Sequence, residues 1–310
     1  MMNTIFDDFK NAWRKANNGL AQLIIINVVV FVASWIAIAI LRIAGMGLGE
    51  AKIALFDFIA LPAAFESFVL RPWTIITYAF THSFSLWHIA INMLILYWFG
   101  RVFVDFLGSQ RLINLYVLGA LSGGTVFLFF YNLVPYFHNM MNPDQPTVMV
   151  GASGAVFAVI VATATYWPEH RFNLLFIGPV KIIYIAVAAI FLSFISLIQN
   201  SNPGGNLAHL AGAMVGFFYA RQLAKGNEWG KWVFTTMQFV KSFFVKSPKV
   251  KVSHRQRKSS KKSQSRTTTT VGGQERADQE EIDKILDKIS ERGYDSLTKS
   301  EKEKLFNASK

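Results

Sequence analysis

The chain has 310 residues, of which 52% are hydrophobic, and its formal net charge is +12. A soluble chain of this length is rarely so apolar, and the absence of cysteine excludes disulfides, thiol nucleophiles and cysteine-based metal sites. Much of the basic excess lies between residues 246 and 274, in a single polar run, so the charge does not indicate a nucleic-acid partner.

The apolar residues are grouped in six blocks. An uncharged block of about 18 or more residues is typical of a membrane-spanning helix. We therefore predict an all-α membrane protein, a six-helix bundle over residues 21–226, preceded by a cytoplasmic segment over residues 1–20. The six blocks lie near Ala21–Leu41, Trp87–Val104, Leu112–Phe137, Met149–Trp167, Ile182–Ile198 and Asn206–Ala224.

Basic residues mark one side of these spans. Lys and Arg precede span 1, lie between spans 2 and 3 and between spans 4 and 5, and follow span 6, whereas the other two short connections carry none. The positive-inside rule then places both termini in the cytoplasm. We expect a multi-pass protein of the cell (inner) membrane, in contact with the lipid bilayer.

The connection between spans 1 and 2, from about Arg42 to Leu86, is longer than a simple connector and is amphipathic. Long loops of this kind are often functional. We expect short helices that lie in the membrane interface, with Trp73 and Tyr78 at the level of the lipid headgroups.

The chain changes character after span 6. Residues 246–279 are basic and low in complexity, which predicts a disordered linker that either contacts anionic lipid or stays solvated. Residues 280–310 predict a small cytoplasmic helical hairpin, whose first helix ends at Gly293 and whose second runs from about Lys299 to Asn307. The hairpin is too small for a proper core of its own, so it docks on an unknown cytoplasmic partner or on itself.

Polar side chains inside spans are costly and mark functional sites by default. Four stand out: His88 and Asn92 in span 2, Ser153 in span 4 and His209 in span 6. Taken singly, each has a structural alternative as interhelical glue, a packing serine or a satisfied buried histidine. All four lie in the first turns of spans that enter from the same side, and a common site explains this shared depth.

Small residues near two of these groups favour close helix packing. Gly151 and Gly154 flank Ser153, and Gly212 belongs to a small-xxx-small ridge beside His209. Such faces can bring a serine and a base within hydrogen-bond reach. No acid of spans 2, 4 or 6 lies at this depth, and nothing ties the loop residue Asp144 to His209, so we infer a Ser–His dyad.

Three motifs carry a family resemblance. In chain order they are "HIAIN" at 88–92, "GASG" at 151–154 and "AHLAGAMVG" at 208–216. Over roughly Phe56 to Ala224 the chain resembles the rhomboid family of intramembrane serine proteases. The resemblance implies that Ser153 is the nucleophile and His209 the general base, that His88 and Asn92 stabilise the oxyanion, and that Phe157 stacks on the histidine. It also implies transmembrane proteins as substrates, with no cofactor and no metal.

Two other functions compete with this one. A catalytically silent rhomboid-like protein would bind membrane clients without cutting them, and would keep the fold while losing the serine or the histidine. A small transporter would have ionisable residues at mid-span and repeated halves, neither of which the sequence has.

Overall fold

The computed structural model describes residues 18–141, 146–174, 177–244, 282–290 and 293–308. The chain divides into two compact units, Met1–Ser247 and Pro248–Lys310, and each is described by itself. Nearly all of the predicted N-terminal segment, Asp144 in the 3–4 connection and the predicted linker up to residue 279 lie outside the described residues.

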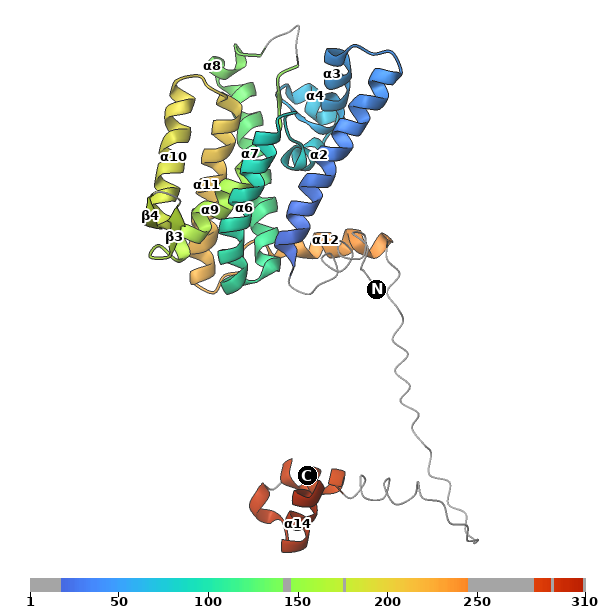
Figure 1. Ribbon diagram of the computed structural model, residues 1–310, viewed down its shortest axis with the longest axis vertical. Coiled ribbons are helices and arrows are strands. Elements are labelled where there is room, and N and C mark those ends of the chain that lie inside the picture. The colour runs from blue at the N-terminus through green and yellow to red at the C-terminus, as the bar shows by residue number, and fades with distance from the viewer. Residues whose placement is uncertain (1–17, 142–145, 175–176, 245–281, 291–292, 309–310) are drawn as a thin grey trace, which may run out of the picture. The chain divides into compact units, whose positions relative to one another are not determined.

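The first unit is a bundle of helices that run roughly alongside one another (Figure 1). Among the described residues, three helices, α2, α6 and α7, are long and apolar enough to cross a membrane, while α9 and α10 are shorter apolar helices. The long helices are α2 Gly19–Ile43, α6 Leu86–Leu107, α7 Ser109–Leu133, α9 Ser153–Tyr166, α10 Ile182–Ile198 and α11 Pro203–Ala224. A mostly helical membrane protein is therefore confirmed, and the count of six spans stays a prediction.

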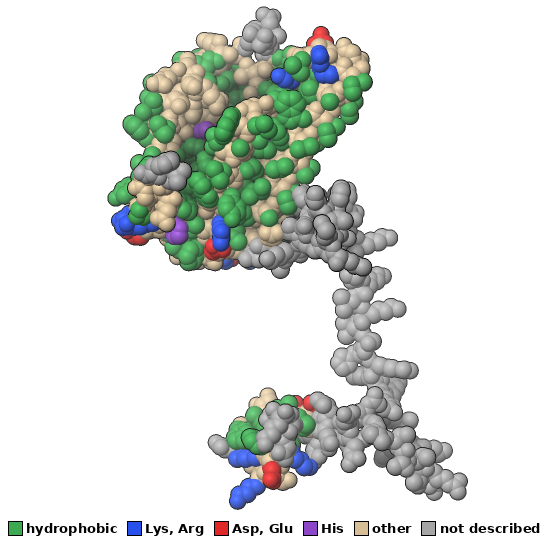
Figure 2. Space-filling view, in the orientation of Figure 1, with side chains coloured by type: hydrophobic (Ala, Val, Ile, Leu, Met, Phe, Trp, Pro, Cys, Tyr) green, Lys and Arg blue, Asp and Glu red, His purple; other side chains and the backbone are tan. Residues whose placement is uncertain are grey.

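Burial explains how α9 can be short. Its 14 residues give a length of about 21 Å, less than the hydrocarbon thickness of about 30 Å. Ten of its 14 residues are buried and none is exposed, so α9 lies inside the bundle. The side of the first unit that is seen in Figure 2 is covered largely by hydrophobic side chains, and charged side chains lie at the two ends of this unit.

Helix α7 ends earlier than the predicted third span, at Leu133 rather than Phe137. Proline disfavours helical backbone in the residue before it, and Val134 accordingly has φ −103° and ψ 114°. The chain then turns into the short helix α8, Pro135–His138, with the proline in its first turn.

Helix α9 begins four residues later than the predicted fourth span. Strand β2, Val148–Met149, pairs antiparallel with β1, Leu61–Pro62, in the first connection. Gly151 follows with φ +132°, a backbone conformation that residues with a Cβ rarely adopt. The strand and the glycine thus delay the helix, so that Ser153 is its first residue.

Helix α11 begins at Pro203, three residues before the predicted sixth span. Asn202, with φ +50°, caps it by accepting a hydrogen bond from the Gly205 N–H at 3.3 Å. Proline suits the first turn of a helix because its missing N–H would have no partner there. In the "NPGG" stretch Asn202 is therefore the cap, and Pro203, Gly204 and Gly205 belong to the helix instead of a loop.

The first connection forms four short helices, α3 Leu48–Ile59, α4 Phe65–Leu70, α5 Thr74–Thr77 and η1 Tyr78–Phe80. Buried hydrogen bonds fix it to the bundle. The Tyr78 hydroxyl donates to the Ala120 carbonyl of α7 at 2.6 Å, and the Gly151 N–H donates to the Tyr78 carbonyl at 3.0 Å. The connection is thus part of the folded core around the start of α9.

Helices α6, α9 and α11 all begin at one end of the bundle, which we call the site end. At the opposite end a hairpin of β3, Arg171–Leu174, and β4, Gly178–Lys181, leads from α9 to α10. Helix α12, Lys231–Phe244, lies across this opposite end (Figure 1). The Arg111 guanidinium pairs with the Glu228 carboxylate at 2.5 Å just before α12.

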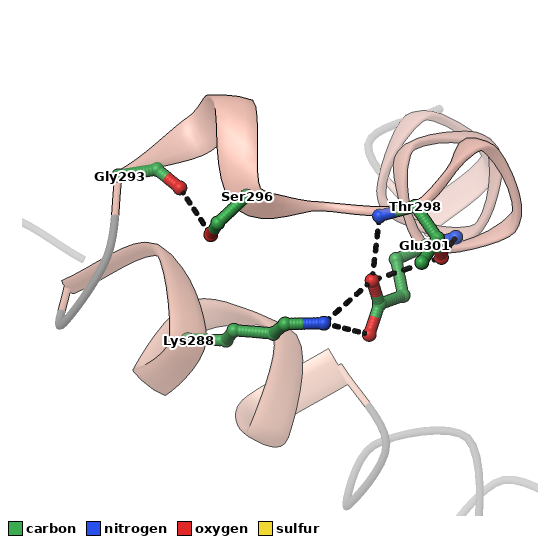
Figure 3. Close-up of polar contacts among 5 residues, drawn as sticks. All are labelled: Lys288, Gly293, Ser296, Thr298 and Glu301. Atoms are coloured by element: carbon green, nitrogen blue, oxygen red, sulfur yellow. Dashed lines mark hydrogen bonds and ion pairs between the residues drawn. The ribbon is translucent and has the colours of Figure 1, made fainter.

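The second unit contains a helix over residues 282–290, the 3-10 turn η2 Tyr294–Ser296 and α14 Lys299–Ala308. Among the described residues of this unit, Ile285 and Leu297 are the buried apolar side chains. Figure 3 shows how charge joins the two helices: the Lys288 ammonium donates to both oxygens of the Glu301 carboxylate, at 2.9 and 3.0 Å. Glu301 also accepts from the Thr298 N–H at 2.7 Å, which caps the start of α14.

Candidate active site

Helices α9 and α11 approach each other so closely that their backbones touch. A Cβ added to Gly212 would lie 2.0 Å from the Gly154 carbonyl oxygen, and one added to Gly216 would lie 2.3 Å from the Ala158 carbonyl oxygen. Only glycine fits at these two positions. The glycine faces therefore set the separation of the two helices that carry Ser153 and His209.

A cavity of about 680 Å³ opens beside this helix pair. Its lining includes His88 and Asn92 from α6, Ser153 from α9 and His209 from α11. The structure thus brings the four polar residues predicted from the sequence together. Gly151, Gly154 and Phe157 also line the cavity, whereas Gly212 lies at the helix contact behind it.

The His209 ring is held on two sides. The Phe157 ring stacks on it, with ring centroids 4.2 Å apart and an interplanar angle of 5°. The hydroxyl oxygen of Ser193, a buried residue of α10, lies 3.1 Å from His209 Nδ1. The sequence analysis missed Ser193, although the cost of a polar group inside an apolar span would have pointed to it.

The hydrogen bonds of His88 decide which of its nitrogens carries the proton. The Ser83 N–H donates to His88 Nδ1 at 3.3 Å, and the Ser83 hydroxyl lies 2.7 Å from the same nitrogen. Because Nδ1 accepts, a neutral His88 carries its proton on Nε2. Ser83 precedes α6, and no motif in the sequence marks it for this role.

The Nε2 atom of His88 and the Ser153 hydroxyl converge on one small space. A Cβ added to Gly151 would lie 3.3 Å from His88 Nε2 and 3.6 Å from Ser153 Oγ. The Asn92 amide donates one hydrogen to the His88 carbonyl at 2.7 Å, which leaves its second N–H for the cavity. The first N–H groups of α9 also lack helical partners, as in any helix. The cavity that holds the Ser153 hydroxyl is thus also lined by the donor groups of His88 and Asn92.

Ser153 itself makes no side-chain hydrogen bond within the described part of the chain. Hydrogen bonds between catalytic groups are often long or misaligned before substrate binds, so this geometry is compatible with a Ser–His pair. Among the described residues that line the cavity there is no Asp or Glu, and Asp144 lies outside the described residues. The residues described here also contain no group of three or more His, Asp and Glu side chains arranged for a metal ion.

A second histidine is buried next to His88. His82, in the first connection, is 1% exposed, and its ring centroid lies 5.3 Å from that of His88. Burial, reinforced by charge on His88, lowers the pKa of His82 to about 4. His82 is therefore neutral at pH 7 and supports His88 by packing.

Several curated proteins are similar to about half of this chain. "RHOMBOID-like protein 12, mitochondrial" of Arabidopsis thaliana is 33% identical over 170 residues, 51% of this chain and 48% of the relative. "Rhomboid protein 1, mitochondrial" of Saccharomyces cerevisiae is 29% identical over 171 residues, 53% of this chain and 45% of the relative. The human "Presenilin-associated rhomboid-like protein, mitochondrial" is 30% identical over 142 residues, 45% of this chain and 35% of the relative. The chain spans about half or less of the length of these relatives.

These relatives contradict the predicted location in the cell membrane, because all three are named as mitochondrial proteins. The prediction was wrong for a physical reason. The distribution of Lys and Arg orients a chain across a membrane, but it carries no information about which membrane that is.

Two family models match separate parts of the chain. A family of unknown function, DUF6576, matches residues 273–310. The Rhomboid domain matches residues 70–226, about half of the chain, and this range contains the cavity residues of α6, α9 and α11. The fold, the site and this match agree, and the chain belongs to the rhomboid family.

Proposed function

We propose that the chain is an intramembrane serine endopeptidase with six membrane spans that cleaves transmembrane segments of other membrane proteins. One observation carries the proposal: a serine and a histidine from two helices in backbone contact line one cavity, with an aromatic ring stacked behind the histidine. Membership of a family made up mostly of serine proteases supports it.

In the proposed reaction Ser153 Oγ attacks the scissile carbonyl carbon, and His209 Nε2 takes the serine proton as the new C–O bond forms. His209 then returns the proton to the leaving amine as the C–N bond breaks. Water, activated by the same histidine, hydrolyses the acyl-enzyme and regenerates Ser153. Ser153 and His209 are the only residues of the chain that exchange protons in this scheme.

The oxyanion would form in front of Gly151. His88 offers its Nε2–H there, because Ser83 occupies the other ring nitrogen, and Asn92 offers its second amide hydrogen. Glycine at position 151 leaves the space open. Each such donor is worth about 10²–10³ in rate when it points at the developing charge.

The test uses membranes that contain tagged single-span proteins together with the wild-type chain or a variant. We expect fragments with wild type, and none with Ser153→Ala or His209→Ala. Ser122→Ala, which removes a serine of α7 outside the cavity lining, is the matched control and should cleave normally.

Two outcomes would contradict the proposal. Cleavage by Ser153→Ala at a near wild-type rate would remove the nucleophile assignment. Co-purification of clients with wild type and Ser153→Ala alike, without fragments from either, would favour the catalytically silent, client-binding alternative.

A further inference from the structure

Only three of the 17 residues of helix α10 are buried, yet one of the three carries a hydroxyl. Its outward side chains include Phe191, 60% exposed, and Leu192, 62% exposed. Its buried residues are Ile182, Ala186 and Ser193, which share the face toward the bundle. Since Ile182 and Ala186 are apolar, Ser193 is the polar one among these three buried residues.

The position of Ser193 gives its hydroxyl a specific partner. Ser193 Oγ lies 3.1 Å from His209 Nδ1, while Phe157 covers a face of the same ring. Stacking fixes the plane of an imidazole, but it does not select which ring nitrogen carries the proton. A hydrogen bond to Nδ1 does select it, because a histidine tautomer is set by the partner of the other nitrogen.

We infer that Ser193 is a positioning residue that accepts a hydrogen bond from His209 Nδ1 and thereby keeps Nε2 free to take the proton of Ser153. The inference rests on the proposed function. A serine hydroxyl can play this part because it accepts through its oxygen lone pairs while its own hydrogen is donated elsewhere, commonly to a carbonyl of the preceding helical turn. The site then consists of Ser153, His209 and Ser193, from three separate helices.

A neutral acceptor differs from the aspartate of a serine-protease triad. It selects the tautomer, but it offers no negative charge to stabilise the imidazolium. Its loss should therefore cost less than the roughly 10⁴-fold fall in kcat that follows when a triad aspartate is changed to asparagine. We expect Ser193→Ala to lower kcat about tenfold or more and to leave KM nearly unchanged.

The competing explanation is that Ser193 only ties α10 to α11. Ser193→Thr keeps the hydroxyl and should restore most of kcat, whereas a purely structural tie gives no reason for kcat to follow the hydroxyl at constant stability. Ser196→Ala is the matched control, because Ser196 lies three residues further along α10 and makes no hydrogen bond with His209 in the described structure. Thermal unfolding of all variants in one detergent shows whether Ser193→Ala stays folded.

Nitrogen-15 NMR of ring-labelled histidine gives a readout independent of cleavage. His209→Gln identifies the His209 signals. In the wild type we expect a protonated Nδ1 and an unprotonated Nε2 on His209, and in Ser193→Ala a mixture of the two tautomers. The spectrum tests Ser193 even if no substrate is cleaved, so failure of the proposed function and failure of this inference are distinguishable.

The inference is overturned if folded Ser193→Ala keeps both wild-type kcat and the Nδ1-protonated tautomer. It is also overturned if folded Ser193→Thr is as impaired as Ser193→Ala. It is supported if Ser193→Ala loses activity and tautomer selection together while Ser196→Ala loses neither.

Discussion

The contact between α9 and α11 and the contact between the two helices of the C-terminal unit are held together in different ways. In the first, glycines of α11 lie directly against carbonyl oxygens of α9 in a buried interface. The stability of this contact therefore requires that these positions carry no side chain. In the second, an ion pair and a capping carboxylate join two short helices that bury few apolar side chains. The first contact should therefore tolerate no added volume, and the second should respond to charge and pH.

The largest expected effect comes from adding a side chain to the glycine contact. Gly212→Val places a Cβ 2.0 Å from the Gly154 carbonyl oxygen, a backbone atom that cannot move aside, and should destabilise the membrane unit by about 3 kcal/mol or more. Gly49→Ala in α3 is the control, because a Cβ there meets no atom within 4 Å, and it should change stability by less than about 1 kcal/mol. Thermal unfolding in detergent measures both, and an unchanged unfolding temperature for Gly212→Val would contradict this account of the interface.

A smaller effect is expected inside the site, where the same helix pair positions the base. Phe157→Ala removes the ring that stacks on His209 and should lower kcat about tenfold to a hundredfold, because a loosened base is less often aligned. Phe157→Tyr retains the ring and should keep most of the activity. Steady-state cleavage of one transmembrane substrate, with thermal stability measured alongside, tests both. Full activity of Phe157→Ala would refute the support assigned to this ring and leave the dyad intact.

The C-terminal unit should respond to pH through Glu301. Its backbone hydrogen bond with Thr298, together with the Lys288 ion pair, lowers the pKa of Glu301 from 4.5 to about 2. A depressed carboxyl pKa stabilises the folded state above the unfolded pKa, and this contribution is lost as the pH falls from about 4.5 to about 2.

Glu301→Gln keeps the shape of the side chain and removes its charge. Hydrogen exchange of α14 amides in the full chain should be faster in this variant than in wild type above pH 4.5, and the difference should shrink toward pH 2. Glu303→Gln, two residues further along the same helix, is the control. Equal exchange in wild type and Glu301→Gln at pH 7 would show that the ion pair and cap contribute nothing to the hairpin.

The smallest expected effect is that of removing the C-terminal unit. Every described residue that lines the cavity lies between positions 78 and 209, and Ser193 falls in the same range, so a chain that ends at about residue 246 should retain wild-type kcat and KM on the same substrate in detergent. Loss of activity in a truncated chain that still unfolds at the wild-type temperature would make the C-terminal unit part of the catalytic machinery.

The sequence by itself determined the apolar helices and the candidate residues within them. Helical periodicity and hydropathy are local properties, so the predicted fifth span coincides with α10, Ile182–Ile198, and the other five differ from the observed helices by a few residues at their ends. The polar groups of those helices could be singled out because any polar side chain in an apolar span is costly. The glycine spacing beside His209 predicted close helix packing, because a spacing of four residues places small residues on one face of a helix.

Tertiary structure alone decided what each of these groups touches. Ser193 of α10 contacts His209 of α11. The pairing of Leu61–Pro62 with Val148–Met149 likewise joins segments that are far apart in the chain. That pairing delays α9, and so makes Ser153 the first residue of its helix. The proton on His88 Nε2 likewise follows from the Ser83 contact, which depends on how the chain enters α6. A periodic pattern specifies which face of a helix is buried. It does not specify which other segment packs against that face, because the contacting segments can be far apart in the sequence.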